Sequence, residues 1–264
     1  MRFCILGSGS SGNCALIVTE GARILVDAGF TARKLESLLA PFGESLARID
    51  AIFLTHEHSD HSSGIAGLKK FQGMKIFANE ATADAIQERL EYRPDWRIFE
   101  TGARFHFLDV DVQSFSVPHD ARDPVGFRFA NGIEGDLFSP RRSLAWLTDL
   151  GHTPDNIREY VDGCDVVVIE ANHCPRLLDE DRRRPWSLKQ RISGRHGHLS
   201  NEAACEFLAG IANPHWRRVY LTHLSRDCNS PDAVAAAFAG ARLTLGCELS
   251  IVGPGEGTPF YDFT

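Results

Sequence analysis

The segment Thr55–His61 gathers, within seven residues, the side chains that proteins use to bind divalent metals. It reads Thr-His-Glu-His-Ser-Asp-His and directly follows an apolar stretch that is predicted to be a strand. Imidazole and carboxylate groups are the ligands that borderline and hard divalent metals prefer. His56 and His58 are two residues apart, so an extended backbone points both to the same side. Asp60 and His61 are adjacent, which suits them to a second metal beside the first.

Further apolar stretches end in residues of the same kind. Strands are predicted over 111–117, 143–147, 166–169 and 219–221, and each is followed by a histidine or a carboxylate. These residues are His119, Asp149, Glu170, His173 and His223. In α/β sheets, ligands gather at the carboxyl ends of strands. A lone histidine at such a place is more often a hydrogen-bonded structural residue, but the dense motif at 55–61 favours one shared metal site.

Short strands and helices alternate along the whole chain, without an internal repeat or a shift in composition. We therefore expect one α/β unit over residues 1–264. Strands are predicted over 2–6, 14–19, 23–27, 49–55, 75–78, 105–108, 111–117, 126–129, 143–148, 166–170, 219–222 and 249–252. Helices are predicted from a cap at Thr31 to Pro41, and over 64–72, 80–90, 155–160, 201–209 and 230–238. The stretch 174–198 is predicted to be an ordered loop with a short helix, with an unstructured linker as the weaker alternative.

Composition excludes several classes of protein. Hydrophobic residues make up 43% and charged residues 24%, which is near the globular average and excludes wholesale disorder. No apolar run approaches the roughly 18 residues of a membrane span, and the first residues do not resemble a signal peptide. We therefore expect a cytoplasmic protein that does not span a membrane. The seven cysteines are scattered without a Cys-x-x-Cys pair, which favours reduced thiols.

The order of the metal-type residues resembles that of the metallo-β-lactamase-fold hydrolases. Their motif is His-x-His-x-Asp-His followed by a His, an Asp and a last His at strand ends, and the resemblance covers nearly the whole chain. It implies an αββα sandwich, in which two mixed β-sheets are flanked by helices, and two divalent metal ions, zinc or manganese. One metal would be held by His56, His58 and His119, the other by Asp60, His61 and His223, with Asp149 bridging.

Five shorter segments resemble one subgroup of that family, the WalJ/YycJ type. They are residues 6–13 (Leu-Gly-Ser-Gly-Ser-Ser-Gly-Asn), 148–151 (Thr-Asp-Leu-Gly), 170–173 (Glu-Ala-Asn-His), 197–201 (Gly-His-Leu-Ser-Asn) and 222–225 (Thr-His-Leu-Ser). Members of this subgroup are described as 5′→3′ DNA exonucleases or as uncharacterised hydrolases. The chain departs from the pattern at Cys174, where an aspartate is expected after the Asn-His pair.

The implied metal centre suggests a hydrolytic mechanism. Two ions about 3.5–4 Å apart can share a bridging hydroxide, which attacks as nucleophile while the ions neutralise charge on a phosphoryl or carbonyl oxygen. Asp149 is assigned to bridging because a carboxylate offers two oxygens. The catalytic candidates are Asp60, Asp149, His173 and His198. His198 can bind a phosphate or protonate a leaving oxygen, with a capping role as the alternative.

Candidate substrate contacts lie in two loops. The Gly/Ser loop after the first strand offers backbone amides and hydroxyls that can cradle a phosphate, although a plain hairpin turn explains it equally well. The second group lies near the later strand ends and the start of a helix. The candidates are Ser10, Ser11, Asn13, Asn172 and Asn201. The arginines at 182–184 and Arg195 are a third possibility, against the commoner interpretation of a solvated basic face.

The leading hypothesis is a metal-dependent phosphodiesterase that acts on DNA as a 5′→3′ exonuclease. The alternative is a small-molecule hydrolase of the same fold: a cyclic phosphodiesterase, a thioesterase or a lactonase. The net charge of −7 favours that alternative slightly, because nucleic-acid binding favours basic surfaces. A metal-binding protein without turnover is a third hypothesis, and the presence of every implied ligand argues against it.

Overall fold

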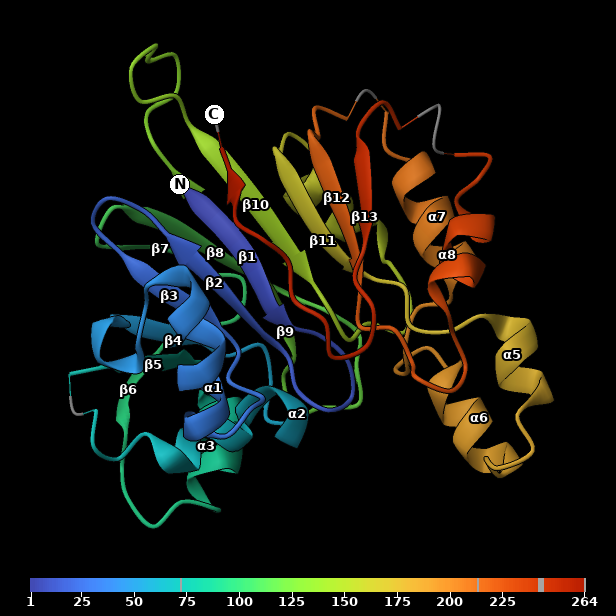
Figure 1. The fold of residues 1–264 in the computed structure, drawn as a ribbon, viewed down its shortest axis with the longest axis horizontal. Coiled ribbons are helices and arrows are strands. Elements are labelled where there is room, and N and C mark those ends of the chain that lie inside the picture. Colours follow the sequence, from blue (N-terminus) through green and yellow to red (C-terminus); the bar gives the residue numbers. More distant parts are fainter. Residues whose placement is uncertain (72, 213, 242–244, 264) are drawn as a thin grey trace.

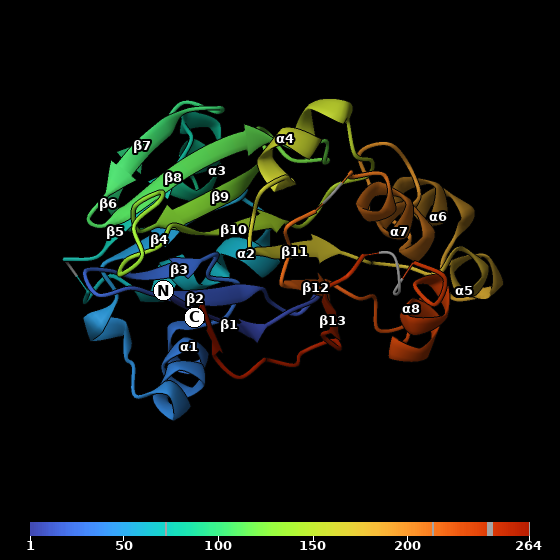
Figure 2. The ribbon, with the colours of Figure 1, turned by 90° about the horizontal axis from the view of Figure 1, so that it is seen from above.

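The computed structural model describes residues 1–264 except 72, 213, 242–244 and 264. Within these described residues, the strands form two seven-stranded sheets that lie face to face, with helices on the outer sides (Figures 1 and 2). The αββα sandwich that the resemblance implied is therefore confirmed. None of the helices in the described residues is long and apolar enough to cross a membrane.

The first sheet is formed by strands from the N-terminal part of the chain and by the last short strand. Its strand order is β14 (Tyr261–Asp262), β1 (Arg2–Gly7), β2 (Cys14–Val18), β3 (Arg23–Val26), β4 (Ala51–Phe53), β5 (Lys75–Ala78), β6 (Asp95–Ile98). The short connections between β1, β2 and β3 make those pairs antiparallel. Longer connections that carry α1 (Ala32–Leu39) and α3 (Glu80–Gln87) make β3 to β6 parallel.

The second sheet is built in the same mixed way. Its strand order is β13 (Glu248–Ile251), β12 (Arg218–Thr222), β11 (Val166–Glu170), β10 (Arg142–Leu147), β9 (Val125–Asn131), β8 (Val110–Ser116), β7 (Arg104–Phe107). The strands β7 to β10 pair antiparallel, and β10 to β13 pair parallel. The parallel strands are joined through α4 (Arg158–Val161), α7 (Asn201–Ala209) and α8 (Pro231–Ala237). Within each sheet, the parallel strands therefore end at the same edge.

The alternation of side chains along each strand builds three apolar layers. In β1, Phe3 and Ile5 face the second sheet, whereas Cys4 packs toward the helices of the first. In β10, Trp146 faces the first sheet and Leu147 faces the outer helices. Strands buried on both faces appear in the sequence as continuous apolar runs, which is why they were predicted.

Helix capping follows the sequence signals. The Ser200 hydroxyl accepts a hydrogen bond from the backbone N–H of Ala203 at the start of α7. The Ser230 hydroxyl caps α8 in the same way, with Pro231 at the first helical position. The predicted helix over 201–209 is confirmed with the same bounds, and Thr31 caps α1 as expected.

Four segments differ from the predictions. The helix expected over 64–72 is replaced by α2 (Ser59–Ser62) and a 3₁₀ segment over Ser63–Gly67; residue 72 lies outside the described residues. Gly64 and Gly67 disfavour a longer helix. The stretch 174–198 contains two helices, α5 (Pro175–Glu180) and α6 (Trp186–Ile192). The strands β6 and β14 were not predicted because they are short edge strands without a strong apolar pattern.

Phe53 is the centre of an aromatic cluster between the sheets, and its truncation tests how far the sandwich depends on that cluster. Its ring is fully buried, stacks on Phe77 at 4.4 Å between centroids, and meets Phe129 edge-on at 5.5 Å. We expect Phe53→Ala to lower the free energy of unfolding by about 3–5 kcal/mol, measured by urea denaturation. The matched control, Phe138→Ala at a fully exposed ring, should change it by no more than about 0.5 kcal/mol. Equal effects of the two variants would contradict this account of the core.

Candidate metal centre

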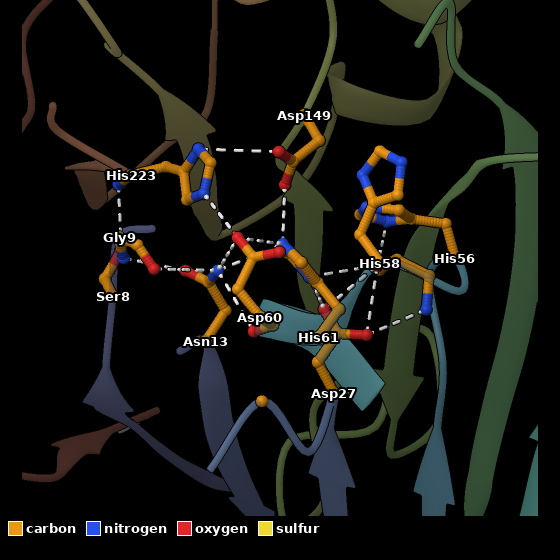
Figure 3. Close-up of polar contacts among 12 residues, drawn as sticks. Ser8, Gly9, Asn13, Asp27, His56, His58, Asp60, His61, Asp149 and His223 are labelled. Atoms are coloured by element: carbon orange, nitrogen blue, oxygen red, sulfur yellow. Dashed lines mark hydrogen bonds and ion pairs between the residues drawn. The ribbon is translucent and has the colours of Figure 1, made fainter. Parts of the chain in front are cut away.

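Strand ends from both sheets bring their polar residues to one edge of the sandwich. The strand β4 leads into the Thr55–His61 segment, and His61 lies in α2. From the second sheet, Asp149 follows β10 and His223 follows β12. Figure 3 shows Asp60, Asp149 and His223 pointing toward one another from these separate elements. Of the strand-end residues, His119, Asp149, Glu170 and His223 gather with the Thr55–His61 motif, and His173 does not.

Within the described residues, the potential ligand atoms form overlapping groups in which all atoms lie within 4.8 Å of one another. One group joins the first two histidines of the motif to the histidine after β8: His56, His58 and His119. Another is Asp60, His61 and His223. Asp149 belongs to two further groups, one with His56 and His61, the other with Glu170, His198 and His223. The arrangement offers two adjacent sets of donors with Asp149 between them.

The second ring nitrogen of several histidines is held by the protein, which fixes the ring. His61 Nδ1 lies 2.8 Å from Asp27 Oδ2, and His119 Nδ1 donates to the Gly197 carbonyl at 2.9 Å. His56 Nδ1 lies 3.0 Å from the Thr55 hydroxyl. Such contacts set the tautomer and orientation of metal-binding imidazoles. They leave Nε2 of each ring directed to the site.

Two unpartnered ring nitrogens indicate that the donor set fits a divalent metal. The Nε2 atoms of His56 and His223 are buried and have no hydrogen-bond partner among the described residues. Buried polar atoms are normally satisfied, because leaving one unpaired costs free energy. A cation held beside Asp60 and Asp149 would satisfy these nitrogens. The donor set therefore fits a divalent metal ion.

The charges of the site shift the pKa values of its members strongly. Burial alone would raise the pKa of Asp149, but the charges of His223 and His61 outweigh it and hold that pKa well below its usual value. Burial alone would lower the pKa of His223, but Asp149, Asp60 and Glu170 raise it to about 10. Burial and the neighbouring His61 hold the pKa of His56 well below its usual value. Asp149 is thus an anionic carboxylate at the centre of the cluster.

Two buried carboxylates support the site: Asp27 had no role in the sequence interpretation, and Glu170 was noted there only as a strand-end carboxylate. Asp27 follows β3 and accepts hydrogen bonds from the Thr55 backbone and hydroxyl as well as contacting His61. Glu170 ends β11, and its Oε2 lies 2.8 Å from Nδ1 of both His198 and His223. Both residues end apolar strands, so their position was a signal of the kind that revealed Asp149. Nothing in the sequence, however, shows which histidines each carboxylate would meet.

Three of these strand-end residues have a left-handed backbone. The φ angles are 61° at Asp27, 58° at Asp149 and 56° at His223. A non-glycine residue in this region costs of the order of 1–3 kcal/mol and persists where the surrounding structure holds it. Here the sharp turn at the end of each strand sends the side chain into the site. The strain is therefore located at the residues that the metal centre requires.

The Gly/Ser loop packs against the metal centre and is more than a hairpin turn. Asn13 is buried, accepts a hydrogen bond from the Gly9 N–H at 2.8 Å, and places Nδ2 3.0 Å from His61 Nε2. Ser10 lines the cavity over the site, whereas Ser11 is exposed and accepts a hydrogen bond from Arg226. The loop thus offers Ser10 to a ligand and uses Asn13 to support the metal-type residues.

The remaining sequence candidates are divided between the cavity and its surroundings. A cavity of about 200 Å³ lies over the centre, and Asn172 and His198 line it. Asn201 is fully buried and hydrogen-bonded to Asn229, so it contacts the protein interior instead. His173 lies outside the groups of potential ligands and lines a neighbouring cavity.

The basic residues of the irregular segment are also divided. Arg184 and Arg191 line the cavity over the metal centre. Arg184 is paired with Asp181 and Asp227, and Arg191 with Asp120. Arg195 instead contacts His152. The sequence does not single out Arg191, because one basic residue in a helix carries no signal of its own.

The family to which the chain belongs follows from comparison with known proteins. The profile of the beta-lactamase superfamily domain matches residues 22–224. The fold of the YhfI protein of Bacillus subtilis, a metallo-beta-lactamase fold protein, superimposes with a TM-score of 0.70 over 97% of this chain and 98% of that one, at 18% identity. The chain belongs to the beta-lactamase superfamily.

Two relatives within the superfamily place the chain in a narrower subgroup. The chain is 36% identical to the exodeoxyribonuclease WalJ of Streptococcus pneumoniae, over 98% of this chain and 96% of that protein. It is 33% identical to the exodeoxyribonuclease YycJ of Bacillus anthracis, over 98% of this chain and 93% of that protein. It is thus a member of the WalJ/YycJ-type subgroup, as the short segments indicated.

Asp27 provides a test of how the protein orients the histidines of the cluster. Asparagine has nearly the same size as aspartate and also tolerates the left-handed backbone. The Asp27→Asn substitution therefore removes little except the charge that holds His61. We expect the affinity for zinc to fall about 10- to 100-fold, measured by competition with a chromophoric chelator. Asp155→Asn, at a side chain that is 98% exposed, is the control and should bind as the wild type does. Unchanged affinity in folded Asp27→Asn would refute the positioning role.

Proposed function

We propose that this protein is a divalent-metal-dependent phosphodiesterase that removes nucleotides from DNA in the 5′→3′ direction, in the cytoplasm. The observation that carries the proposal is the convergence of histidine and aspartate side chains around Asp149 in a chain similar over nearly its whole length to two exodeoxyribonucleases. The fold alone would not support a substrate, because one fold serves many reactions.

Two metal ions, zinc or manganese, fit the two sets of donors. We assign His56, His58 and His119 to one ion, and Asp60, His61 and His223 to the other, with Asp149 shared. When bound, such a pair lowers the pKa of a water molecule and neutralises charge on the phosphoryl group. Asp149 suits the shared position because it is buried, anionic and in contact with donors of both sets.

His198 is the residue we assign to proton transfer or to contact with the phosphate. Its Nδ1 is held by Glu170 at 2.8 Å, and the ring lines the cavity over the metal centre. Burial would lower the pKa of His198, but Glu170 and Asp149 raise it above its usual value. A raised pKa favours the protonated ring, which suits it to bind an anionic oxygen or to protonate the departing one. Glu170 acts through His198 as a positioning residue.

The polar rim of the cavity suits a phosphodiester. Ser10, Arg184 and Arg191 line it together with Asn172. Guanidinium groups bind phosphate through two parallel hydrogen bonds, and a few local arginines offset the negative net charge of the chain where the substrate meets the site. We assign these residues to the substrate phosphates on either side of the bond that is cleaved.

Hydrolysis of end-labelled DNA tests the proposal. Metal-reconstituted wild-type protein should release nucleotides stepwise from the 5′ end, and rising salt should weaken the reaction steeply because several phosphates are bound. Asp149→Ala and His58→Ala should reduce hydrolysis to background while keeping the fold, checked by circular dichroism. Asp155→Ala, at an exposed carboxylate, is the matched control and should retain full activity.

Two outcomes would contradict the proposal. Near-full activity of Asp149→Ala or His58→Ala would refute the metal mechanism. If wild-type protein loaded with metal left DNA intact but cleaved bis-p-nitrophenyl phosphate independently of salt, the protein would instead be a hydrolase of small esters or phosphodiesters.

A further inference from the structure

A second cavity adjoins the one over the metal centre. It has a volume of about 360 Å³, within the range of ligand pockets, and it is bounded by α5, α6 and the start of α7. The two cavities share His198 in their walls. A ligand with one end at the metal centre can therefore extend past His198 into this second space.

The walls of the second cavity are largely uncharged. Pro175, Leu178 and Trp186 provide its apolar surface. Asp179 and Lys189 also line it, and their opposite charges offset each other. Such a lining suits an uncharged, flat group better than a phosphate, because Lys189 already donates to the Asp179 backbone carbonyl and the Asp179 carboxylate would repel an anion.

Two features of this cavity have no explanation in the fold or in the metal centre. Trp186 is 65% exposed, although a large aromatic ring is normally covered. His173 is only 3% exposed, and its Nδ1 has no hydrogen-bond partner among the described residues. Burial lowers the pKa of His173 to about 4, so the ring is neutral and offers one donor and one acceptor nitrogen. A planar ring with polar edges would satisfy both residues.

We propose that the cavity between α5, α6 and α7 receives the nucleobase of the terminal nucleotide whose phosphodiester bond lies at the metal centre. The inference rests on the proposed function and names a subsite for it. The Trp186 ring stacks on the face of the base, which is a contact that every base can make. His173 hydrogen-bonds the edge of the base. A base in this cavity has left the helical stack, so the enzyme acts on a terminal nucleotide that is unpaired or frayed.

Trp186→Ala and a substrate without the terminal base test the subsite together. The substrates are two oligonucleotides with identical phosphates, one with a natural 5′-terminal nucleotide and one with an abasic residue there. Wild-type protein should have a kcat/KM about 5- to 100-fold lower on the abasic substrate, from the loss of one stacked base. Trp186→Ala should lose a similar factor on the natural substrate and equal the wild type on the abasic one. Trp186→Phe should recover most of the loss, because it keeps an aromatic face.

Controls separate the subsite from general damage. Phe138→Ala removes an exposed aromatic ring that does not line the cavity and should leave both rates unchanged. His173→Phe keeps a ring but removes both nitrogens, and it should slow only the natural substrate. If Trp186→Ala matched the wild type on both substrates, or slowed both equally, the proposal would be overturned.

A binding measurement keeps the test independent of catalysis. In an Asp149→Ala background, the natural oligonucleotide should quench the fluorescence of Trp186, and the abasic oligonucleotide should not. The same titration with Trp186→Phe added to that background identifies the signal. If wild-type protein fails to cleave DNA, the proposed function fails, and this titration still decides the subsite. Equal quenching by both oligonucleotides, or none by either, would refute base binding.

Discussion

Two buried carboxylates, Asp27 and Glu170, hold the imidazole cluster together, and the rest of the site depends on them. The rings are crowded: those of His56 and His61 lie 4.2 Å apart between centroids, and those of His198 and His223 lie 5.4 Å apart. Buried histidines at this distance repel one another when protonated and rotate unless a partner fixes them. A buried charge is tolerated only when it is paired and hydrogen-bonded. Each carboxylate is satisfied by the residues it orients, so the support and the cluster stabilise each other.

The two carboxylates come from different sheets, so the site depends on how the sheets pack. Asp27 follows β3 and Glu170 ends β11, so the cluster forms only when the sheets pack with these strand ends together. Loops at this edge approach so closely that side chains are excluded. A Cβ at Gly29 would lie 1.7 Å from the Asp60 carbonyl oxygen, and one at Gly197 would lie 2.2 Å from the Arg191 carbonyl oxygen. These glycines allow the backbone to carry the metal-type residues into contact.

Patterns among neighbouring residues in the sequence predicted those features of the structure that neighbouring residues form. The Thr55–His61 motif was recognised because its donors are neighbours in sequence, and the apolar strands because their side chains are buried on both faces. The partners of Asp27 and Glu170 could not be predicted, since a carboxylate after a strand looks the same whether it meets a histidine or solvent. The helices α5 and α6 were underestimated because their stretch has few apolar residues and rests on the site edge instead of forming the core.

Residues 174–198 were the hardest to predict from the sequence, yet they lie beside the metal centre, whose Thr55–His61 motif was the easiest to recognise. The reason is that the strand ends and the segment 174–198 have different roles in the fold. The strand ends define the reaction, because the metal-type donors need rigid elements to hold them. Residues 174–198 bound the cavity beside the metal centre, and a segment outside the core can vary without loss of the sandwich. The similarity to exonucleases along the whole chain therefore supports the chemistry. We assign contact with the terminal base to Trp186, which the core does not require and which stays exposed at that edge.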